Sequence, residues 1–110
     1  MRIAVFTAAA TLALLAMPPA QAADPTFTVV IKDHMFEPAR IEVPAGQKIQ
    51  LIVKNMDTTA EEFDSPELKR EKVIAAGKEA TIYLGPLKPG TYRFVGEYHG
   101  ATAKGELVAK

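Results

Sequence analysis

Few side chains in this chain could bind a metal ion with high affinity. The 110 residues include two histidines, His34 and His99, and no cysteine. Imidazole and carboxylate groups suit Cu(II), iron or zinc, whereas thiolates are the ligands that favour Cu(I) and iron–sulfur clusters. Any metal centre in this chain must therefore be built without a thiolate.

Acidic residues stand close to one of the histidines. Glu97 precedes His99 by two positions, and side chains two apart in a strand share a face, so these two could bind one ion together. The alternative is that His99 already lies in the loop after the strand. Glu61 and Glu62 are adjacent, and adjacent residues of a strand point to opposite faces. Only one of them is therefore expected to face a given site. The simpler interpretation is that all four are ordinary surface residues, with the glutamates in weak ion pairs.

Other kinds of chemistry find little support. Ser65 is the only serine, and no histidine stands beside it in a recognisable nucleophile motif. Two histidines exclude a three-histidine zinc centre, although two histidines and one glutamate could bind zinc. Lys plus Arg equals Asp plus Glu at 13 each, so no basic surface for nucleic acid is expected.

The N-terminus has the layout of a secretory signal peptide. Arg2 precedes an almost wholly apolar stretch over residues 3–17, and Ala20-Gln21-Ala22 is a small-x-small cleavage site. The apolar stretch is too short to span a bilayer. We expect cleavage after Ala22, which leaves residues 23–110 as one exported domain in a bacterial periplasm. The alternative is an uncleaved anchor.

The rest of the chain has the pattern of an all-β protein. Apolar residues alternate with other residues over 49–53 and over 80–84, and turn signals recur about every 8–12 residues. Lys88-Pro89-Gly90 places Pro and Gly where a type II turn requires them. This pattern predicts a β-sandwich. Residues 57–72 are poorly patterned and are compatible with a loop containing a helical turn over 65–68, or with an irregular strand.

These segments resemble a known family. Residues 36–46, which end in the Pro44-Ala45-Gly46 turn, together with residues 49–55 and Asp57, resemble the first half of a cupredoxin. Residues 90–94 and 104–108 resemble its second half. More narrowly, the motifs Glu61-Glu62-Phe63, Arg70-Glu71-Lys72 and Gly96-Glu97-Tyr98-His99 resemble cupredoxin-like periplasmic proteins associated with bacterial high-affinity iron permeases. The resemblance implies a Greek-key β-sandwich of seven or eight strands with a metal site at one end.

The resemblance also shows what is missing. A blue copper centre uses two histidines, a cysteine and a weak axial ligand, usually methionine. The first histidine falls on Glu61 or Glu62, the cysteine on Gly96 and the second histidine on His99; the axial methionine falls within residues 102–104, which include no methionine. One ligand of four is retained, so the composition excludes a blue copper centre.

A different ligand set follows if the family's topology holds. In the cupredoxin pattern the loop after the first strand reaches the same end of the domain as the other ligands, so both histidines are expected to meet there. Met35, beside His34, could add a soft ligand, although packing is the simpler interpretation for both Met35 and Phe36. The predicted metal ligands are His34, His99, Glu61, Glu97, Glu62 and Met35.

The function implied is that of a periplasmic accessory protein that binds copper or iron and serves iron uptake. Its expected partner is an iron permease or another periplasmic iron-uptake component, and it would meet the membrane only through that partner. Two alternatives remain open: a metal-free docking module, and a copper-dependent ferroxidase. Because a ligand imidazole must be neutral, metal affinity is expected to fall as the pH drops through about 6.

Overall fold

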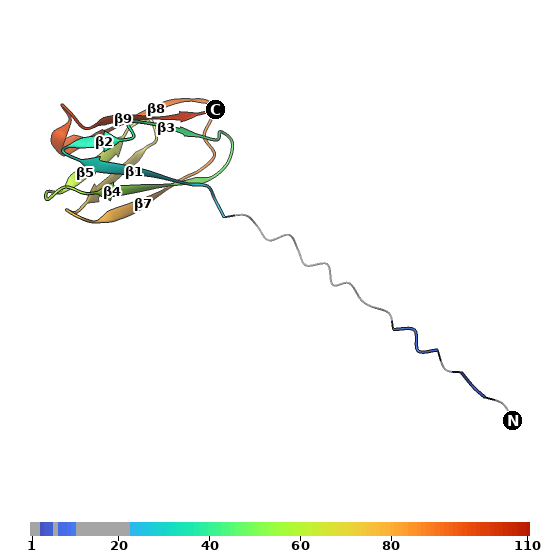
Figure 1. Ribbon diagram of the computed structural model, residues 1–110. Coiled ribbons are helices and arrows are strands. Elements are labelled where there is room, and N and C mark those ends of the chain that lie inside the picture. Colours follow the sequence, from blue (N-terminus) through green and yellow to red (C-terminus); the bar gives the residue numbers. More distant parts are fainter. Residues whose placement is uncertain (1–2, 6, 11–22) are drawn as a thin grey trace.

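A computed structural model describes residues 3–5, 7–10 and 23–110 (Figure 1). Residues 26–109 form an all-β sandwich, which confirms the predicted fold class. The strands are β1 (Thr26–Lys32), β2 (Met35–Glu37), β3 (Arg40–Val43), β4 (Ile49–Asn55), β5 (Glu61–Ser65), β6 (Arg70–Ile74), β7 (Glu79–Leu84), β8 (Gly90–Gly96) and β9 (Lys104–Ala109), with one 3-10 turn, η1 (Glu97–His99), between the last two.

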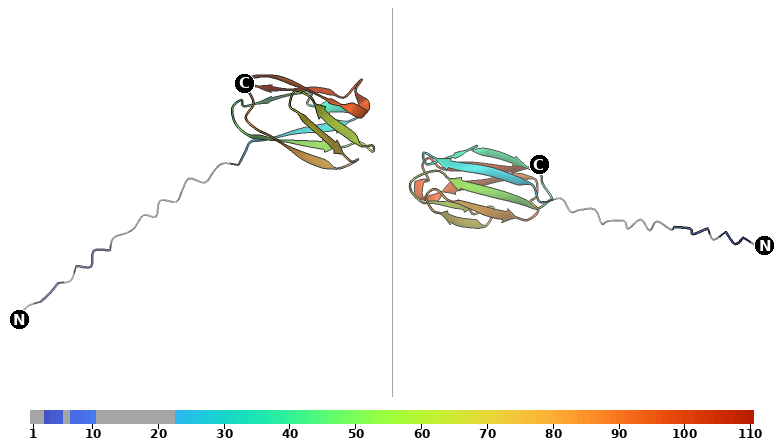
Figure 2. Two further views of the ribbon diagram at one scale, coloured as in Figure 1. Left: turned by 180° about the vertical axis from the view of Figure 1, so that it is seen from behind. Right: turned by 60° about the horizontal axis from the view of Figure 1, so that its bottom comes forward.

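The strands form two layers, which the two views of Figure 2 show from different sides. One sheet has the order β2-β1-β4-β7 and the other the order β3-β9-β8-β5-β6. Strands β1 and β4 run parallel, as do β3 and β9, and the other pairings are antiparallel. The ends of β1, β4 and β8 therefore deliver their loops to one pole of the sandwich, away from the C-terminus (Figure 1).

The strand count is the main difference from the sequence-based prediction. The described residues form nine strands rather than seven or eight. Residues 57–72 account for part of this difference, because they contain β5 and the start of β6 rather than one irregular strand. The turn expected over residues 65–68 forms, as a single turn: the Ser65 hydroxyl accepts the Leu68 N–H at 3.1 Å and donates to the Arg93 carbonyl at 2.7 Å.

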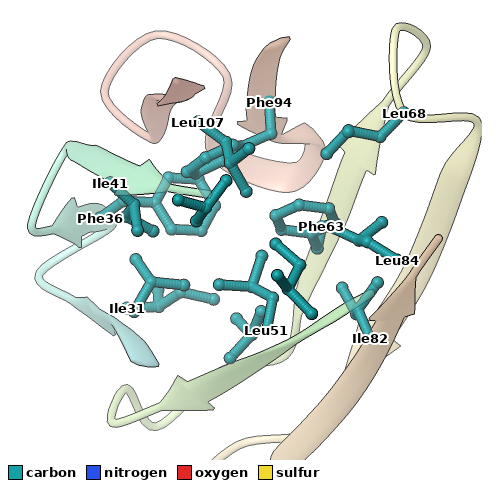
Figure 3. Packing of buried hydrophobic residues seen from close by; sticks show 14 of the residues in the cluster. Ile31, Phe36, Ile41, Leu51, Phe63, Leu68, Ile82, Leu84, Phe94 and Leu107 are labelled. Carbon is teal, nitrogen blue, oxygen red and sulfur yellow. The ribbon is translucent and has the colours of Figure 1, made fainter. Parts of the chain in front are cut away.

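Three phenylalanines fill the core between the two sheets (Figure 3). The Phe36 and Phe94 rings meet edge to face with centroids 4.8 Å apart, and Phe63 stacks on Phe94 at 5.0 Å. In a strand, side chains two apart share a face. Glu61 and Gly96 therefore lie on the same inner faces of their strands as Phe63 and Phe94, so the aromatic cluster fixes both residues at the pole.

The described residues contain no helix that is both long and apolar enough to cross a membrane. The signal peptide expected over residues 1–22 lies largely outside the described part of the chain, and its cleavage after Ala22 remains a prediction.

Candidate metal centre

The two histidines meet at the pole. The His34 ring, in the β1–β2 turn, stacks on the His99 ring of η1 with centroids 3.5 Å apart and planes 10° from parallel. Both side chains are partly accessible, and they come from two loops that are far apart in the sequence. The topology thus brings together the only two imidazoles of the chain, as the resemblance implied. That the two histidines bind a metal ion remains a prediction.

Glu61 supports this pair from inside the domain. Its side chain is 2% exposed, compared with 26% for His99, and its Oε2 lies 2.6 Å from His99 Nδ1. Its Oε1 accepts the backbone N–H groups of Tyr98 at 2.9 Å and Glu62 at 3.0 Å. An ionised carboxylate can only accept hydrogen bonds, so in a neutral His99 ring beside an ionised Glu61 the hydrogen sits on Nδ1 and Nε2 presents its lone pair. Carboxylates orient metal-ligating histidines in this way.

The position assigned to cysteine by the resemblance has no room for a side chain. A Cβ atom added to Gly96 would lie 2.6 Å from the Ala103 Cβ and 2.7 Å from the Glu61 Cδ. Contacts this short force neighbouring atoms to move. The Glu61 carboxyl group therefore occupies the space that a cysteine side chain at position 96 would need. A thiolate ligand is thus excluded at this position by the packing as well as by the composition.

Gly96→Ala is expected to destabilise the domain by about 2 kcal/mol, because overpacking a filled core forces side chains and backbone to shift. The matched control is Gly100→Ala. A Cβ at Gly100 meets nothing closer than the Gly96 carbonyl at 3.9 Å, and its φ of −61° suits alanine. Urea unfolding of both variants measures the difference. Equal stability of the two would contradict the proposed crowding at Gly96.

His34 lies in a tight turn with an unusual backbone. Lys32 pairs with Met35, so Asp33 and His34 form a two-residue hairpin turn, with φ angles of 52° and 57°. Left-handed backbone at non-glycine residues is uncommon and costs free energy unless the surroundings hold it. Here the Asp57 carboxylate accepts the N–H of Asp33 at 2.8 Å and of His34 at 3.0 Å. Partial burial acts to raise the pKa of Asp57, but these hydrogen bonds and the nearby imidazoles outweigh it and lower the pKa.

The stacked arrangement limits how one ion could bind both rings. A metal ion lies near the plane of a ligating imidazole at about 2.0–2.1 Å from nitrogen. Two nearly parallel rings with centroids 3.5 Å apart cannot both point nitrogen lone pairs at one ion. Joint ligation therefore requires one ring to turn, and His34 is the freer of the two because Glu61 holds His99 through Nδ1.

Glu97 does not lie where a strand would have placed it. The strand β8 ends at Gly96 and residues 97–99 form η1, so Glu97 and His99 do not share a strand face as expected. Glu97 gathers instead with Glu62 and Glu71, whose carboxylate oxygens lie within 4.8 Å of one another. Of the adjacent pair, Glu61 is therefore the residue beside the imidazoles, while Glu62 belongs to a separate acidic cluster.

Like charges in this acidic cluster act on Glu97. The negative charge of Glu62, followed by that of Asp64, raises the pKa of Glu97 above its usual value. A carboxyl whose folded pKa is raised contributes most to stability below its unfolded pKa of about 4.3, and that contribution is lost as the pH rises through the folded value. At neutral pH the ionised Glu97 therefore weakens the fold.

Glu97→Gln is accordingly expected to leave the free energy of unfolding at pH 7 unchanged or slightly higher. Any gain should vanish in about 1 M salt, where exposed charges are screened within about 3 Å. The control is Glu37→Gln, which changes an exposed carboxylate of β2 outside the cluster. Denaturant unfolding at low and high salt measures both, and a clear loss of stability in Glu97→Gln at pH 7 would contradict the repulsion.

Met35 and Phe36 behave differently from each other. Phe36 is buried in the core, as expected, but Met35 is 46% exposed at the start of β2, so the interpretation that it packs is wrong. Its role as a ligand remains a prediction. Sequence reasoning assigned no role to Asp57 or Glu71. The Asn55-x-Asp57 spacing was a usable turn signal, since Asn55 Oδ1 accepts the Asp57 N–H at 3.0 Å.

Comparison with known proteins agrees with the fold. The profile of the cupredoxin-like domain family matches residues 5–109. The uncharacterized protein RP394 of Rickettsia prowazekii (strain Madrid E) is 46% identical over 80 residues, which are 73% of this chain, and the match spans 64% of that protein's length.

Two solved structures show the same architecture at low sequence identity. The metal-binding domain of the Cu(I)-exporting P-type ATPase CopA of Streptococcus pneumoniae D39, solved with Cu(I), has a TM-score of 0.69 at 16% identity, over 77% of this chain and 84% of that one. Auracyanin A, a blue copper protein of Chloroflexus aurantiacus, has a TM-score of 0.68 at 15% identity, over 80% and 100%. At these identities the likeness concerns the fold.

Proposed function

Because the chain belongs to the cupredoxin-like domain family, we propose that it binds a copper or iron ion at the pole where His34 and His99 meet. The observation that carries this proposal is the pairing of the only two imidazoles of the chain, with a buried carboxylate behind one of them. Glu61 is almost wholly removed from water, and its contact with His99 Nδ1 holds that ring in a fixed orientation, as carboxylates behind metal-ligating histidines do.

The donor atoms at this pole suit a harder metal ion than the donor atoms of a blue copper centre do. Imidazole nitrogen and carboxylate oxygen suit Cu(II), iron and zinc, and the chain offers no thiolate. The related folds include the Cu(I)-loaded domain and the blue copper protein described above, so copper is a reasonable ion for this architecture. In the proposed site His99 presents Nε2 and the His34 ring turns toward the same ion, while Glu61 holds His99 in the required tautomer.

We further propose that the protein is exported to a periplasm and serves iron uptake as an accessory of an iron permease. The support is the resemblance of Glu61-Glu62-Phe63 and Gly96-Glu97-Tyr98-His99 to proteins of that kind. The ion would be delivered to a partner, and the partly accessible position of the histidine pair at one end of the domain suits such a transfer. The signal peptide over residues 1–22 belongs to the same proposal.

A second candidate function is a metal-free docking module. The observation that favours it is that the site is closed on itself: His99 Nδ1 is paired with Glu61, and the His34 ring covers the His99 ring. A pole that is complete without an ion could simply be a rigid surface for a protein partner.

Titration of residues 23–110 with Cu(II), Fe(II) and Zn(II), by calorimetry and by competition with a chelator, tests these functions. We expect tight binding of one Cu(II) or iron ion per chain. No binding of any ion would contradict the metal function and favour the docking module. Oxidation of Fe(II) that continues over many cycles in the copper-loaded protein would instead identify a ferroxidase.

A further inference from the structure

The backbone of His34 is held from both sides by residues to which no role has been assigned. Its N–H donates to Asp57 Oδ2 at 3.0 Å, and its carbonyl accepts the hydroxyl of Thr102 at 2.6 Å. Asp57 follows β4 and Thr102 follows η1, so the two contacts come from different loops. These two contacts, here called the clamp, fix the N–H and the carbonyl of His34, whose φ of 57° is unfavourable on its own.

Asp57 is itself held firmly in place. Asn55, which is buried, accepts the Asp57 N–H through Oδ1 at 3.0 Å. The Asn55 side-chain amide donates to the carbonyls of Thr59 at 2.9 Å and Ile74 at 3.0 Å. The carboxylate that grips the His34 turn is therefore tied through Asn55 to the end of β6, in the opposite sheet. Such a chain of hydrogen bonds makes the position of Asp57 independent of the turn.

Thr102 links the His34 carbonyl, which it binds through its hydroxyl, to the loop of the second histidine. The N–H groups of Thr102 and Ala103 donate to the His99 carbonyl at 3.1 Å and 2.8 Å, which closes the loop that carries η1. The residue that binds the His34 carbonyl is thus fixed relative to His99. The distance between the two histidine backbones is set by these contacts before any ion is present.

We propose that Asp57 and Thr102 are positioning residues that hold His34 beside His99 in the metal-free protein. The inference rests on the proposed metal function. The clamp binds backbone groups of Asp33 and His34 and does not contact the His34 ring, so the ring can turn about its side-chain bonds toward an ion, as joint ligation requires. Supporting residues outside the ligand shell typically contribute 10–100-fold to metal affinity, because they orient the ligands in advance.

Asp57→Asn tests the clamp. The two carboxylate oxygens of Asp57 each accept one N–H group, from Asp33 and from His34, whereas the amide of asparagine has only one acceptor oxygen. In the metal-free protein, the amides of Asp33 and His34 should exchange with solvent at least about ten-fold faster, and Cu(II) affinity should fall about 10–100-fold. The matched control is Asp33→Asn, which removes one negative charge from the same turn and keeps the acceptors. Asparagine is well suited to that left-handed position, so its exchange rates and affinity should match the wild type.

Thr102→Val and Thr102→Ser provide the second arm. Valine removes the hydroxyl that binds the His34 carbonyl and should weaken Cu(II) binding, whereas serine keeps the hydroxyl and should restore it. Equal affinity of wild type, Asp57→Asn and Thr102→Val would overturn the clamp and leave the metal function standing. An equal loss in Asp33→Asn and Asp57→Asn would also overturn it, because charge rather than position would then be the cause. If the wild type binds no ion, the metal function itself fails, and the clamp as a device for metal binding fails with it.

Discussion

A variant that lacks both imidazoles, His34→Asn with His99→Gln, is expected to lose Cu(II) affinity by more than about 100-fold. Loss of an outer-shell partner already costs about 10–100-fold, and the loss of direct ligands costs more. Asparagine suits the left-handed backbone of His34, and the glutamine amide can still donate to the buried Glu61, so the fold should persist. Each single variant should fall between the double variant and the wild type. Competition with a chelator measures all four proteins.

The control for this experiment is Glu97→Gln. Glu97 neighbours His99 in the sequence, but its carboxylate lies with Glu62 and Glu71 rather than with the imidazoles. Its substitution should change Cu(II) affinity by less than about three-fold, an effect of charge alone. If the double variant binds like the wild type, the proposed centre is wrong, and a loss in Glu97→Gln alone would then place the ion on the acidic cluster.

Glu61→Ala is expected to lower the free energy of unfolding by about 3 kcal/mol. The change removes a carboxylate that accepts the N–H of Tyr98, the N–H of Glu62 and His99 Nδ1, and it leaves a cavity above Gly96. Buried donors that lose their partner cost about 1–3 kcal/mol each, and water can replace the partner only on the exposed side of His99. Denaturant unfolding with an unchanged m-value measures the loss.

Glu61→Gln separates the structural role of Glu61 from its role in orienting His99. Glutamine keeps an oxygen that can accept the backbone N–H groups, so most of the stability should return. Its amide nitrogen would then face His99 Nδ1 as a donor, and the imidazole would have to carry its hydrogen on Nε2 instead. We therefore expect this variant to be folded but weaker in Cu(II) binding. A folded Glu61→Gln protein with unchanged affinity would contradict the assigned tautomer.

Much of the fold could be predicted because the apolar positions repeat with a clear period of two. Ile49, Leu51 and Val53 are all buried, as their alternation indicated. The strands within residues 57–72 could not be predicted clearly because they are short. In addition, β6 is an edge strand exposed at four of its five positions, so its sequence has little apolar pattern to detect. The turn at Ser65 was predicted, whereas the hydrogen bond from its hydroxyl to the Arg93 carbonyl, which is distant in the sequence, was not.

The meeting of the two histidines could be predicted from the family's topology. The positions of the residues around them could not. The choice between Glu61 and Glu62 was left open, although Phe63 could have decided it: a core aromatic places the residue two positions earlier on the inner face. Glu97 was misplaced because nothing in Gly96-Glu97-Tyr98-His99 marks the end of the strand. The clamp by Asp57 joins two loops through backbone N–H groups, which no side-chain pattern records.

The most direct test of the central claim is pulsed electron paramagnetic resonance of the protein loaded with one equivalent of Cu(II). This measurement detects the remote nitrogen of each copper-bound imidazole and counts the imidazoles. We expect two coupled imidazoles in the wild type, one in each single histidine variant and none in the double variant. A wild-type signal without imidazole coupling, or one unchanged in His34→Asn and His99→Gln, would contradict this expectation.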